Sequence, residues 1–415
     1  MKIIFLTVLV STFLFSNDNL LDTVIISGNK NTKEHVIRRE ILHPLNQVLD
    51  SLILSEDINR LYNLGIFSTV DIQAENNTYN VKVVESFSIL PDLVIDYSEI
   101  TKKWSYGLGL AHINFLGLNQ QLYLGGAFIG EKWFAISLDD PWIYGDHVSL
   151  KSVIYNKFGD NPFYDYRFNA TYFLLETGFY NGLNNKFEFG LSYYKNKKHT
   201  SSELLPLSEK DTYRYLNAEF NYQYDTRDIY KDPLKGSLFN FNVRYSKSLI
   251  KSNSDISQFS FSLQQFFLIP FKYLHEPVLS YNISGLFKFP EFSKLPIHEY
   301  EYLGGEDFVR GYSSFPDDFP DDFQKNIEVS NIIYNHLELQ STILKKKDYG
   351  KIEFGMDGLL FVNSGIGSKS ANDFSLDNFL IGYGFGFKFF ITGPPPISIM
   401  FGYNPYGQSF THLEN

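Results

Sequence analysis

The chain has 415 residues, of which 17% are Phe, Tyr or Trp, yet its mean hydropathy of −0.18 is mildly polar. The net charge of −11 leaves no broad basic surface for phosphates, so no nucleic-acid partner is expected. The absence of cysteine excludes a disulfide framework, a Cys-ligated metal and a lipid anchor of the lipoprotein type.

Residues 1–16 have the pattern of a secretory signal peptide. Lys2 supplies a positive start, residues 3–15 are mainly apolar, and Ser16 is a small residue before a polar stretch. A buried N-terminal strand or helix is the alternative. Because no later stretch holds the roughly 18 unbroken apolar residues of a membrane-spanning helix, the sequence predicts an exported protein without one.

Residues 20–87 predict a small independent domain with the order β-α-α-β-β. The second helix carries one apolar stripe, and Gly65 is placed to end it. An Asn-Asn turn joins the last two strands. The expected elements are a strand at 23–29, helices at 32–42 and 49–64, and strands at 67–76 and 78–86.

Residues 88–415 predict strands only. In one segment Phe189 and Leu191 share a face, whereas Gly190 and Ser192 share the other. At roughly 20 residues per strand and connection, about sixteen strands fit this length. A soluble sandwich or propeller also has alternating strands, but abundant Phe and Tyr favour a membrane barrel, where aromatic rings lie at both lipid–water interfaces. The predicted fold class is mainly β, a transmembrane antiparallel barrel of about 16 strands preceded by one α+β domain.

Three motifs follow one another in this part of the chain: YDTRDIYKDPLKGSLFNF at 224–241, YLGGEDFVRGY at 302–312 and LLFVNSGIG at 359–367. With them the chain resembles the BamA superfamily of outer-membrane barrels, or bacterial surface antigens, which assemble barrel proteins or translocate polypeptides. Residues 20–87 resemble the family's POTRA domain and residues 88–415 its barrel. The resemblance covers nearly all of the mature chain. It implies an outer-membrane location, with the POTRA domain in the periplasm.

The resemblance gives a role to the long connection at about 290–325, which is roughly 36 residues long and therefore longer than ordinary loops. In the family, the sixth extracellular loop folds back into the barrel lumen, where the arginine of its tip meets inward acidic side chains. The implied tip residues are Val309, Arg310, Gly311 and Tyr312. The implied turn residues are Gly304 and Gly305, which let the chain double back.

The acceptors of Arg310 follow from the same resemblance. Glu338 matches the family's inward glutamate, and Asn363 stands where the family has an aspartate. Asp357 shares the strand parity of Asn363 and is expected to supply the missing charge. The alternative is an Arg310 in a solvated loop, where an ion pair would contribute less than about 1 kcal/mol.

Two further features leave alternatives open. Gly382, Gly384 and Gly386 share one face of a strand, and they either make room for the returning loop or mark a flexible, weakly paired strand. The repeat PDDFPDDF at 316–323 offers four carboxylates for a cation. Because it lacks the glycine and the spacing of a calcium loop, a solvated acidic loop is the favoured interpretation.

No enzyme signature is present: the sequence has neither Gly-x-Ser-x-Gly nor His-Glu-x-x-His, and its 9 histidines are scattered. No catalytic residue, metal or cofactor is therefore expected. The barrel turn motif shared with the family is interpreted as a charged turn or a lumen network. It comprises Asp225, Arg227, Asp228, Pro233 and Gly236.

The C-terminus departs from the family pattern. Family barrels usually finish with a sixteenth strand that ends in an aromatic residue. Here residues 396–408 predict the penultimate strand, and only residues 409–415 follow. Either the strand count is shifted by one, or the last strand is very short, or the chain is incomplete.

The resemblance implies folding and insertion of other outer-membrane proteins. A client strand would pair with the family's edge strand, here about residues 67–75 with Phe67, Val70 and Ile72. The expected partners are unfolded outer-membrane protein clients, outer-membrane lipid, and periplasmic or lipoprotein accessory subunits. One alternative is a secretion pore of the two-partner type, whose members carry two POTRA domains and a plug helix. The other is a passive porin, against which the POTRA-like segment argues.

Overall fold

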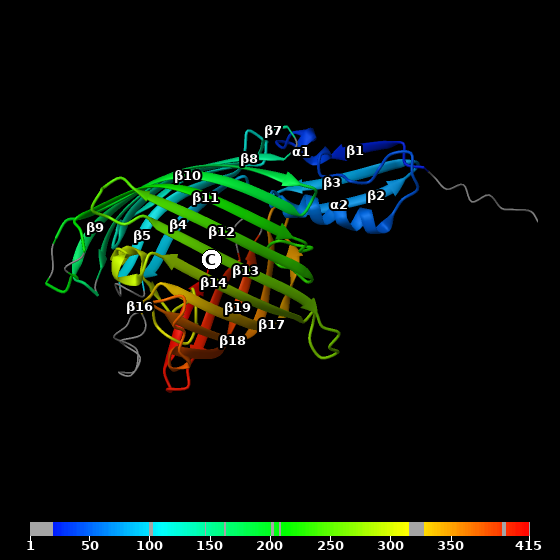
Figure 1. Ribbon diagram of the computed structural model, residues 1–415. Helices are drawn as coiled ribbons and strands as arrows, with labels where there is room; N and C mark the ends of the chain where they lie inside the picture. Colours follow the sequence, from blue (N-terminus) through cyan, green and yellow to red (C-terminus); the bar gives the residue numbers. More distant parts are fainter. Residues whose placement is uncertain are drawn as a thin grey trace, which may run out of the picture.

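The computed structural model describes residues 20–98, 103–145, 147–161, 163–200, 203–206, 209–314, 328–391 and 396–414. These residues form a small α+β domain and a large, strongly curved antiparallel sheet (Figure 1). The predicted signal peptide and the acidic repeat at 316–323 lie outside the described residues.

The N-terminal domain has the predicted order of elements, but its first helix is shorter than expected. The helix α1 covers five residues instead of the predicted 32–42, because the amides of Leu42 and His43 leave the helical pattern. They donate to the buried carboxylate of Asp57, at 2.7 and 3.3 Å. The elements are β1 (Thr23–Ser27), α1 (Glu34–Arg38), α2 (Ser51–Asn63), β2 (Phe67–Glu75) and β3 (Thr78–Glu85).

The helix α2 supplies most of this domain's helical packing. It begins after Asp50, whose side chain accepts hydrogen bonds from the amides of Leu52 and Ile53, and it ends before Gly65 as predicted. Leu61 on its apolar stripe is fully buried against the sheet. Among the described residues, no helix has both the length and the apolar character that crossing a membrane requires.

The three strands of the domain lie in the order β1-β3-β2, so β2 is an edge strand as the sequence predicts. Phe67 and Ile72 are buried in the domain core and Val70 packs against it. The side chains expected to meet a client therefore point into the domain, and the edge of β2 offers its backbone groups.

Sixteen strands form the large sheet, in agreement with the predicted number. Their side chains alternate as expected: on β10, Leu191 is 62% exposed and Ser192 on the opposite face is 2% exposed. The strands are β4 (Ile89–Ser98), β5 (Lys103–Phe115), β6 (Gln120–Ile129), β7 (Lys132–Tyr144), β8 (Val148–Asn161), β9 (Tyr166–Asn181), β10 (Asn185–Lys198), β11 (Thr212–Asp225), β12 (Gly236–Ser248), β13 (Ile256–Leu268), β14 (Val278–Phe289), β17 (Asn331–Asp348), β18 (Glu353–Ser368), β19 (Phe379–Ile391), β20 (Ile397–Tyr403) and β21 (Ser409–Glu414).

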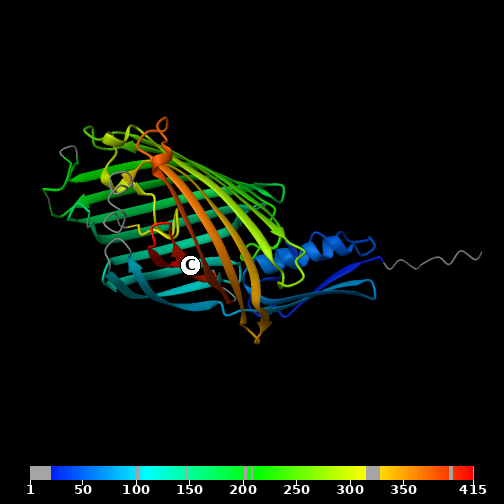
Figure 2. The ribbon, with the colours of Figure 1, turned by 90° about the horizontal axis from the view of Figure 1, so that it is seen from below.

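The last strand is very short, which decides among the three alternatives for the C-terminus. β20 is the predicted penultimate strand, and β21 adds only six residues. β21 and β4 stand at the two ends of the strand order, and within the described ranges no ladder joins them. The sheet nevertheless curves round into a barrel-like shape whose inner face is concave (Figure 2).

The N-terminal domain rests on turns at one end of the sheet, called here the proximal end; the opposite end is called distal (Figure 1). The Asn63 side chain donates to the carbonyl of Asp228 and accepts from the amide of Tyr230, both at 2.9 Å. Ser68 donates to the carbonyl of Gly350 at 3.0 Å. The Lys33 amide donates to the carbonyl of Gly117 at 2.9 Å. Three separate proximal turns thus hold the domain in place.

Candidate functional site

The connection between β14 and β17, at residues 290–330, folds back against the inner face of the sheet. It is slightly longer than predicted because β17 begins at Asn331. Figure 2 shows its described part, in yellow, on the concave side. It contains the 3-10 turns η1 (Phe292–Lys294) and η2 (Ile297–Glu299) and the short strands β15 (Glu301–Tyr302) and β16 (Glu328–Val329), which pair with each other.

The Val-Arg-Gly-Tyr tip of this loop is anchored in a small apolar cluster. Val309 and Tyr312 are 0% and 2% exposed. Their cluster joins the loop to β17 and β19 through Leu303, Val329, Ile332 and Leu380. A Cβ on Gly365 of β18 would lie only 2.8 Å from a Val309 methyl, so this wall position leaves room for the tip. Removal of this apolar surface from water favours the folded-back position of the loop.

Arg310 is buried and bound by three strands at once. Its Nη2 donates to the carboxylate of Glu338 on β17 and, at 3.1 Å, to Oδ1 of Asn363 on β18. The guanidinium lies 4.3 Å from the ring centroid of Phe361 and contacts the sulfur of Met400 on β20. The Arg310 side chain is 2% exposed. The prediction of an arginine held inside the barrel is therefore confirmed, and the solvated-loop alternative is wrong.

Gly311 brings the loop backbone against the last strands of the sheet. Its φ of +99° belongs to the region that favours glycine. Its amide donates to Nε2 of His412 at 3.1 Å, and its carbonyl accepts from Nδ2 of Asn404 at 2.9 Å. A Cβ on Gly382 would lie 1.8 Å from the carbonyl oxygen of Arg310. Of the two readings of the glycine face on β19, the one that makes room for the loop holds at Gly382.

The predicted acceptors of Arg310 have different outcomes. Glu338 is the charged partner and Asn363 the neutral one, as expected. Asp357 is not part of this site. It lies six residues before Asn363 on β18, which is about 20 Å at the ordinary rise of a strand. Its carboxylate accepts instead from Gln340, whose Nε2 also contacts Asp232 in a proximal turn, at 2.8 Å. Parity placed Asp357 on the correct face but at the wrong height.

Gly304 and Gly305 form the predicted turn before the tip. The Gly305 amide donates to the carbonyl of Tyr312 at 3.0 Å, which closes the loop on itself. Gly305 has a φ of +89°, and Gly304 beside it is buried.

A second ionic anchor of the loop was not foreseen from the sequence. Glu299 in η2 is 6% exposed and contacts Arg244 of β12 at 2.7 Å and Lys288 of β14 at 3.1 Å. Lys288 also binds Glu301, at 2.6 Å. Here the loop supplies the acids and the wall supplies the cations, which is the reverse of the Arg310 site. The inward parity of Arg244 and Lys288 was the available signal.

The barrel turn motif forms a self-contained charged turn at the proximal end. Arg227 donates through Nε and Nη2 to the two oxygens of Asp225, at 3.0 and 2.8 Å. The Asp228 side chain accepts from the amides of Ile229 and Leu234, at 2.9 and 3.0 Å. Pro233 is buried and Gly236 begins β12. This turn is also the one that the N-terminal domain grips through Asn63.

The described part of the chain contains no group of three or more His, Cys, Asp or Glu side chains that could hold a metal ion. The acids that the sequence analysis singled out bind instead to arginine, to glutamine or to backbone amides. The geometry therefore anchors a loop and a domain. It does not assemble a reactive centre among these residues.

Comparisons with known proteins match both parts of the chain. The Omp85 superfamily domain matches residues 114–408, and the POTRA model, a surface antigen variable number repeat, matches residues 21–86.

Solved structures resemble the whole chain in fold. BamA from Haemophilus ducreyi lacking POTRA domains 1–3 has a TM-score of 0.57 at 17% identity, covering 95% of this chain and 82% of that one. CdiB from Escherichia coli has a TM-score of 0.58 at 14% identity, covering 95% and 76%. CdiB from Acinetobacter baumannii has a TM-score of 0.53 at 14% identity, covering 95% and 73%.

Proposed function

Because the chain belongs to the Omp85 superfamily, we propose that it is an outer-membrane barrel, with its POTRA domain in the periplasm, that folds and inserts other outer-membrane proteins. The role is non-enzymatic and requires no cofactor. Unfolded outer-membrane proteins are the clients, outer-membrane lipid surrounds the barrel, and periplasmic or lipoprotein subunits assist.

The observation that carries this proposal is the pair of strand edges at the ends of the sheet. β4 has ten residues and β21 has six, and in the described ranges neither has a ladder partner on its outer side. An edge strand presents a row of unpaired amide and carbonyl groups, which an extended chain can bind. A client strand that pairs with β4 would exchange water for backbone hydrogen bonds at this seam.

The POTRA domain offers a second edge of the same kind. β2 pairs only with β3 among the described residues, and its strand runs away from the barrel (Figure 1). Since Phe67 and Ile72 point into the domain core, an incoming chain would be recognised through its backbone rather than through these side chains. Backbone recognition suits a general assembly factor, whose clients differ in sequence.

A dedicated polypeptide secretion pore is the second candidate. The observation in its favour is the position of the POTRA domain, which rests directly on three proximal turns of the barrel. A chain bound there would reach the barrel interior at once. The tip of the loop would then have to leave its site to open a path.

Depletion of the protein in its native cell distinguishes the two candidates. The measurement is the outer-membrane proteome during depletion. If many unrelated barrels decrease together, assembly is supported. If a single secreted or surface protein disappears while the barrels persist, the assembly proposal is wrong and the secretion pore takes its place.

Cysteine crosslinking tests the seam directly, because the native chain has no cysteine. Leu93→Cys on β4 is expected to crosslink to a cysteine in the terminal strand of a client during assembly. Leu191→Cys on β10 is the matched control, since both leucines are exposed, at 69% and 62%, but β10 has strands on both sides. Equal crosslinking at the two positions would contradict pairing at the seam.

A further inference from the structure

Cationic side chains gather on the outer face of the sheet at its distal end. On β9 to β12 they follow the strand positions whose side chains point away from the concave interior. The same face carries Leu191 and Leu216, which are 62% and 49% exposed. We call this group the distal basic face; it comprises Arg167, Lys195, Lys197, Arg214 and Lys247.

The strand register brings these cations together. Lys195 lies directly opposite Arg214, and Lys197 lies two residues further along the same face. Lys247 faces Leu216, so it is the diagonal neighbour of Arg214. Directly opposite side chains have their Cβ atoms roughly 5 Å apart, and like charges in that position destabilise a sheet. The arrangement therefore disfavours the isolated protein unless an anion lies between the cations.

Acidic neighbours compensate only part of this charge. Lys247 binds Asp255 at 2.7 Å. Arg167 contacts Asp160 at 3.4 Å, and Asp160 also binds Lys103 at 2.9 Å.

Across the described residues, Lys195, Lys197 and Arg214 have no ion-pair partner at salt-bridge distance. A chain with a net charge of −11 thus keeps three adjacent, uncompensated cations on one outward surface.

The residues next to the cations fix their height relative to a membrane. Tyr193 and Leu216 lie opposite each other, directly proximal to the Lys195–Arg214 pair on the same face. Two residues of strand correspond to about 7 Å. Apolar and aromatic residues of a barrel face the lipid and its interface, so the cations lie at the level of the lipid head groups. Because this end is remote from the POTRA domain, these head groups are those of the outer leaflet.

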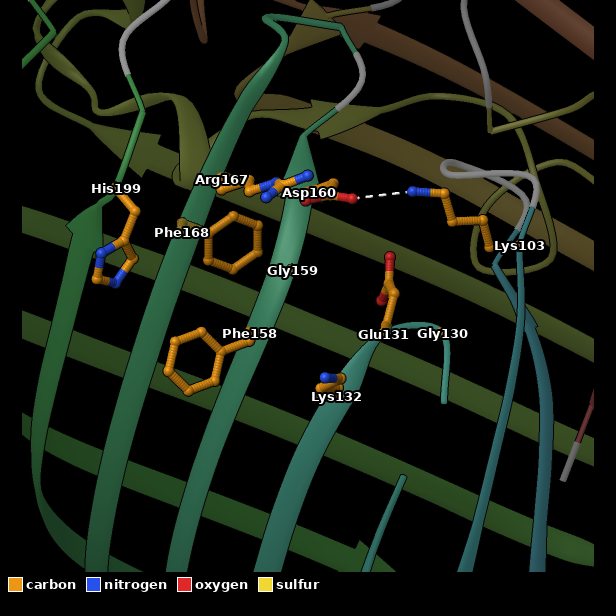
Figure 3. Close-up of a pocket in the computed structure, with 10 residues that line it drawn as sticks. All are labelled: Lys103, Gly130, Glu131, Lys132, Phe158, Gly159, Asp160, Arg167, Phe168 and His199. Atoms are coloured by element: carbon orange, nitrogen blue, oxygen red, sulfur yellow. Dashed lines mark hydrogen bonds and ion pairs between the residues drawn. The ribbon is translucent and has the colours of Figure 1, made fainter. Parts of the chain in front are cut away.

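A pocket adjoins the distal basic face. It has a volume of about 400 Å³, and it lies at the distal ends of β5 to β10. Figure 3 shows the rings of Phe158 and Phe168 on the adjacent strands β8 and β9, beside Arg167 and His199. Lys132 also lines the pocket. Arg167 belongs to both the pocket and the distal basic face, so the two surfaces are continuous.

We propose that the distal basic face and this pocket bind the phosphate-bearing head group of an outer-leaflet lipid. Arginine and lysine are the usual phosphate ligands, and an arginine can bind two phosphate oxygens at once. An anion between Lys195 and Arg214 would convert their repulsion into shared attraction. The inference rests on the proposed membrane location and is independent of the choice between assembly and secretion.

The test uses the full chain in phosphatidylcholine vesicles that contain diphosphorylated lipid A or its dephosphorylated form. Lipid retained after detergent extraction is quantified by mass spectrometry. The triple variant Lys195→Gln, Lys197→Gln, Arg214→Gln is expected to bind the phosphorylated lipid on the order of 100-fold more weakly than the wild type, since each cation at an anionic surface contributes roughly 1 kcal/mol. The matched control changes three exposed cations nearer the proximal end: Lys272→Gln, Lys345→Gln and Lys347→Gln.

The control variant is expected to retain the lipid as the wild type does. Equal retention by the triple variant, equal losses in both variants, or equal binding of the dephosphorylated lipid would each overturn the proposal. Displacement of the lipid by inorganic phosphate at the same concentration would also overturn it, because the site would then bind free anions. Protease protection in the vesicles reports insertion separately. A wild-type chain that fails to insert contradicts the membrane location instead.

Discussion

The amide of Gly311 donates to Nε2 of His412 at 3.1 Å, across 101 residues of chain. This bond ties the tip of the long loop to the last strand of the sheet. Because β21 has only six residues and borders the seam, its position depends on the loop as well as on its ladder with β20. The loop and the seam are therefore one mechanical unit.

Arg310→Ala is expected to destabilise the folded barrel by about 3–5 kcal/mol, because it leaves the Glu338 carboxylate without its buried cation. Arg310→Lys keeps the charge but loses the planar fork, so it should restore only part of the stability. Thermal unfolding and protease cleavage within residues 290–330 measure the effect. Arg38→Ala is the control, since its pair with Glu34 is exposed. Equal stability of Arg310→Ala and Arg38→Ala would show that the site contributes nothing.

Asn363→Asp is expected to stabilise the protein, because it places a second negative charge beside Arg310. It also replaces the Asn363 side-chain amide nitrogen, which has no hydrogen-bond partner among the described residues. In an Arg310→Ala background the same change should destabilise, since the new carboxylate is buried and unpaired. Thermal unfolding of the four proteins forms a double-mutant cycle. A change of the same sign in both backgrounds would rule out direct coupling.

His412→Phe is expected to cost about 1–3 kcal/mol, because the buried amide of Gly311 loses its acceptor. The loss should be local. Hydrogen exchange is expected to increase in residues 409–414 and 309–314 before the central strands respond. His35→Phe, at an exposed position, is the control. Faster exchange in the loop alone, with β21 unchanged, would contradict the link to the seam.

The pH dependence of the second anchor follows from Glu299. Burial alone would raise the pKa of Glu299, but the charges of Lys288 and Arg244 outweigh burial and hold that pKa well below its ordinary value. A lowered folded-state pKa gives stability that is fully present above the unfolded value of about 4.3. That stability is lost only as the pH falls through the folded value.

The loop is therefore expected to stay attached at about pH 4, where an ordinary glutamate is largely protonated. Glu299→Gln should weaken the attachment at neutral pH and remove this acid dependence. A fluorophore on Ser293→Cys reports attachment through its mobility. Glu291→Gln is the matched control, because Glu291 forms only an exposed pair with Lys294. Detachment of the wild-type loop already at about pH 5 would contradict the prediction.

Much of the fold could be predicted because strand alternation is a local signal. The exposed Leu191 and the buried Ser192 differ in face for a reason that lies within their own strand. The pairing of Arg310 with Glu338 came from the motif and from parity together. The shortened α1 could not be predicted, because the Asp57 carboxylate that ends it lies on the following helix.

The remaining parts of the site depend on distances that parity does not give. Asp357 shares a face with Asn363 but lies too far along β18 to reach Arg310. His412, Asn404 and Met400 were missed because their contacts with the tip depend on how far the sheet curves before its last strands. The register between segments about a hundred residues apart is not written in either segment alone.

The His412 contact also constrains the order in which the barrel forms. Each strand of the sheet pairs with its neighbour in sequence, apart from the step between β14 and β17, so hairpins can form as soon as both strands are available. The tip of the loop must wait, because its acceptors on β20 and β21 are among the last residues to emerge from synthesis. Until then Arg310 lacks part of its binding site. A ribosome-bound or truncated chain would thus hold a nearly complete sheet around an unseated loop.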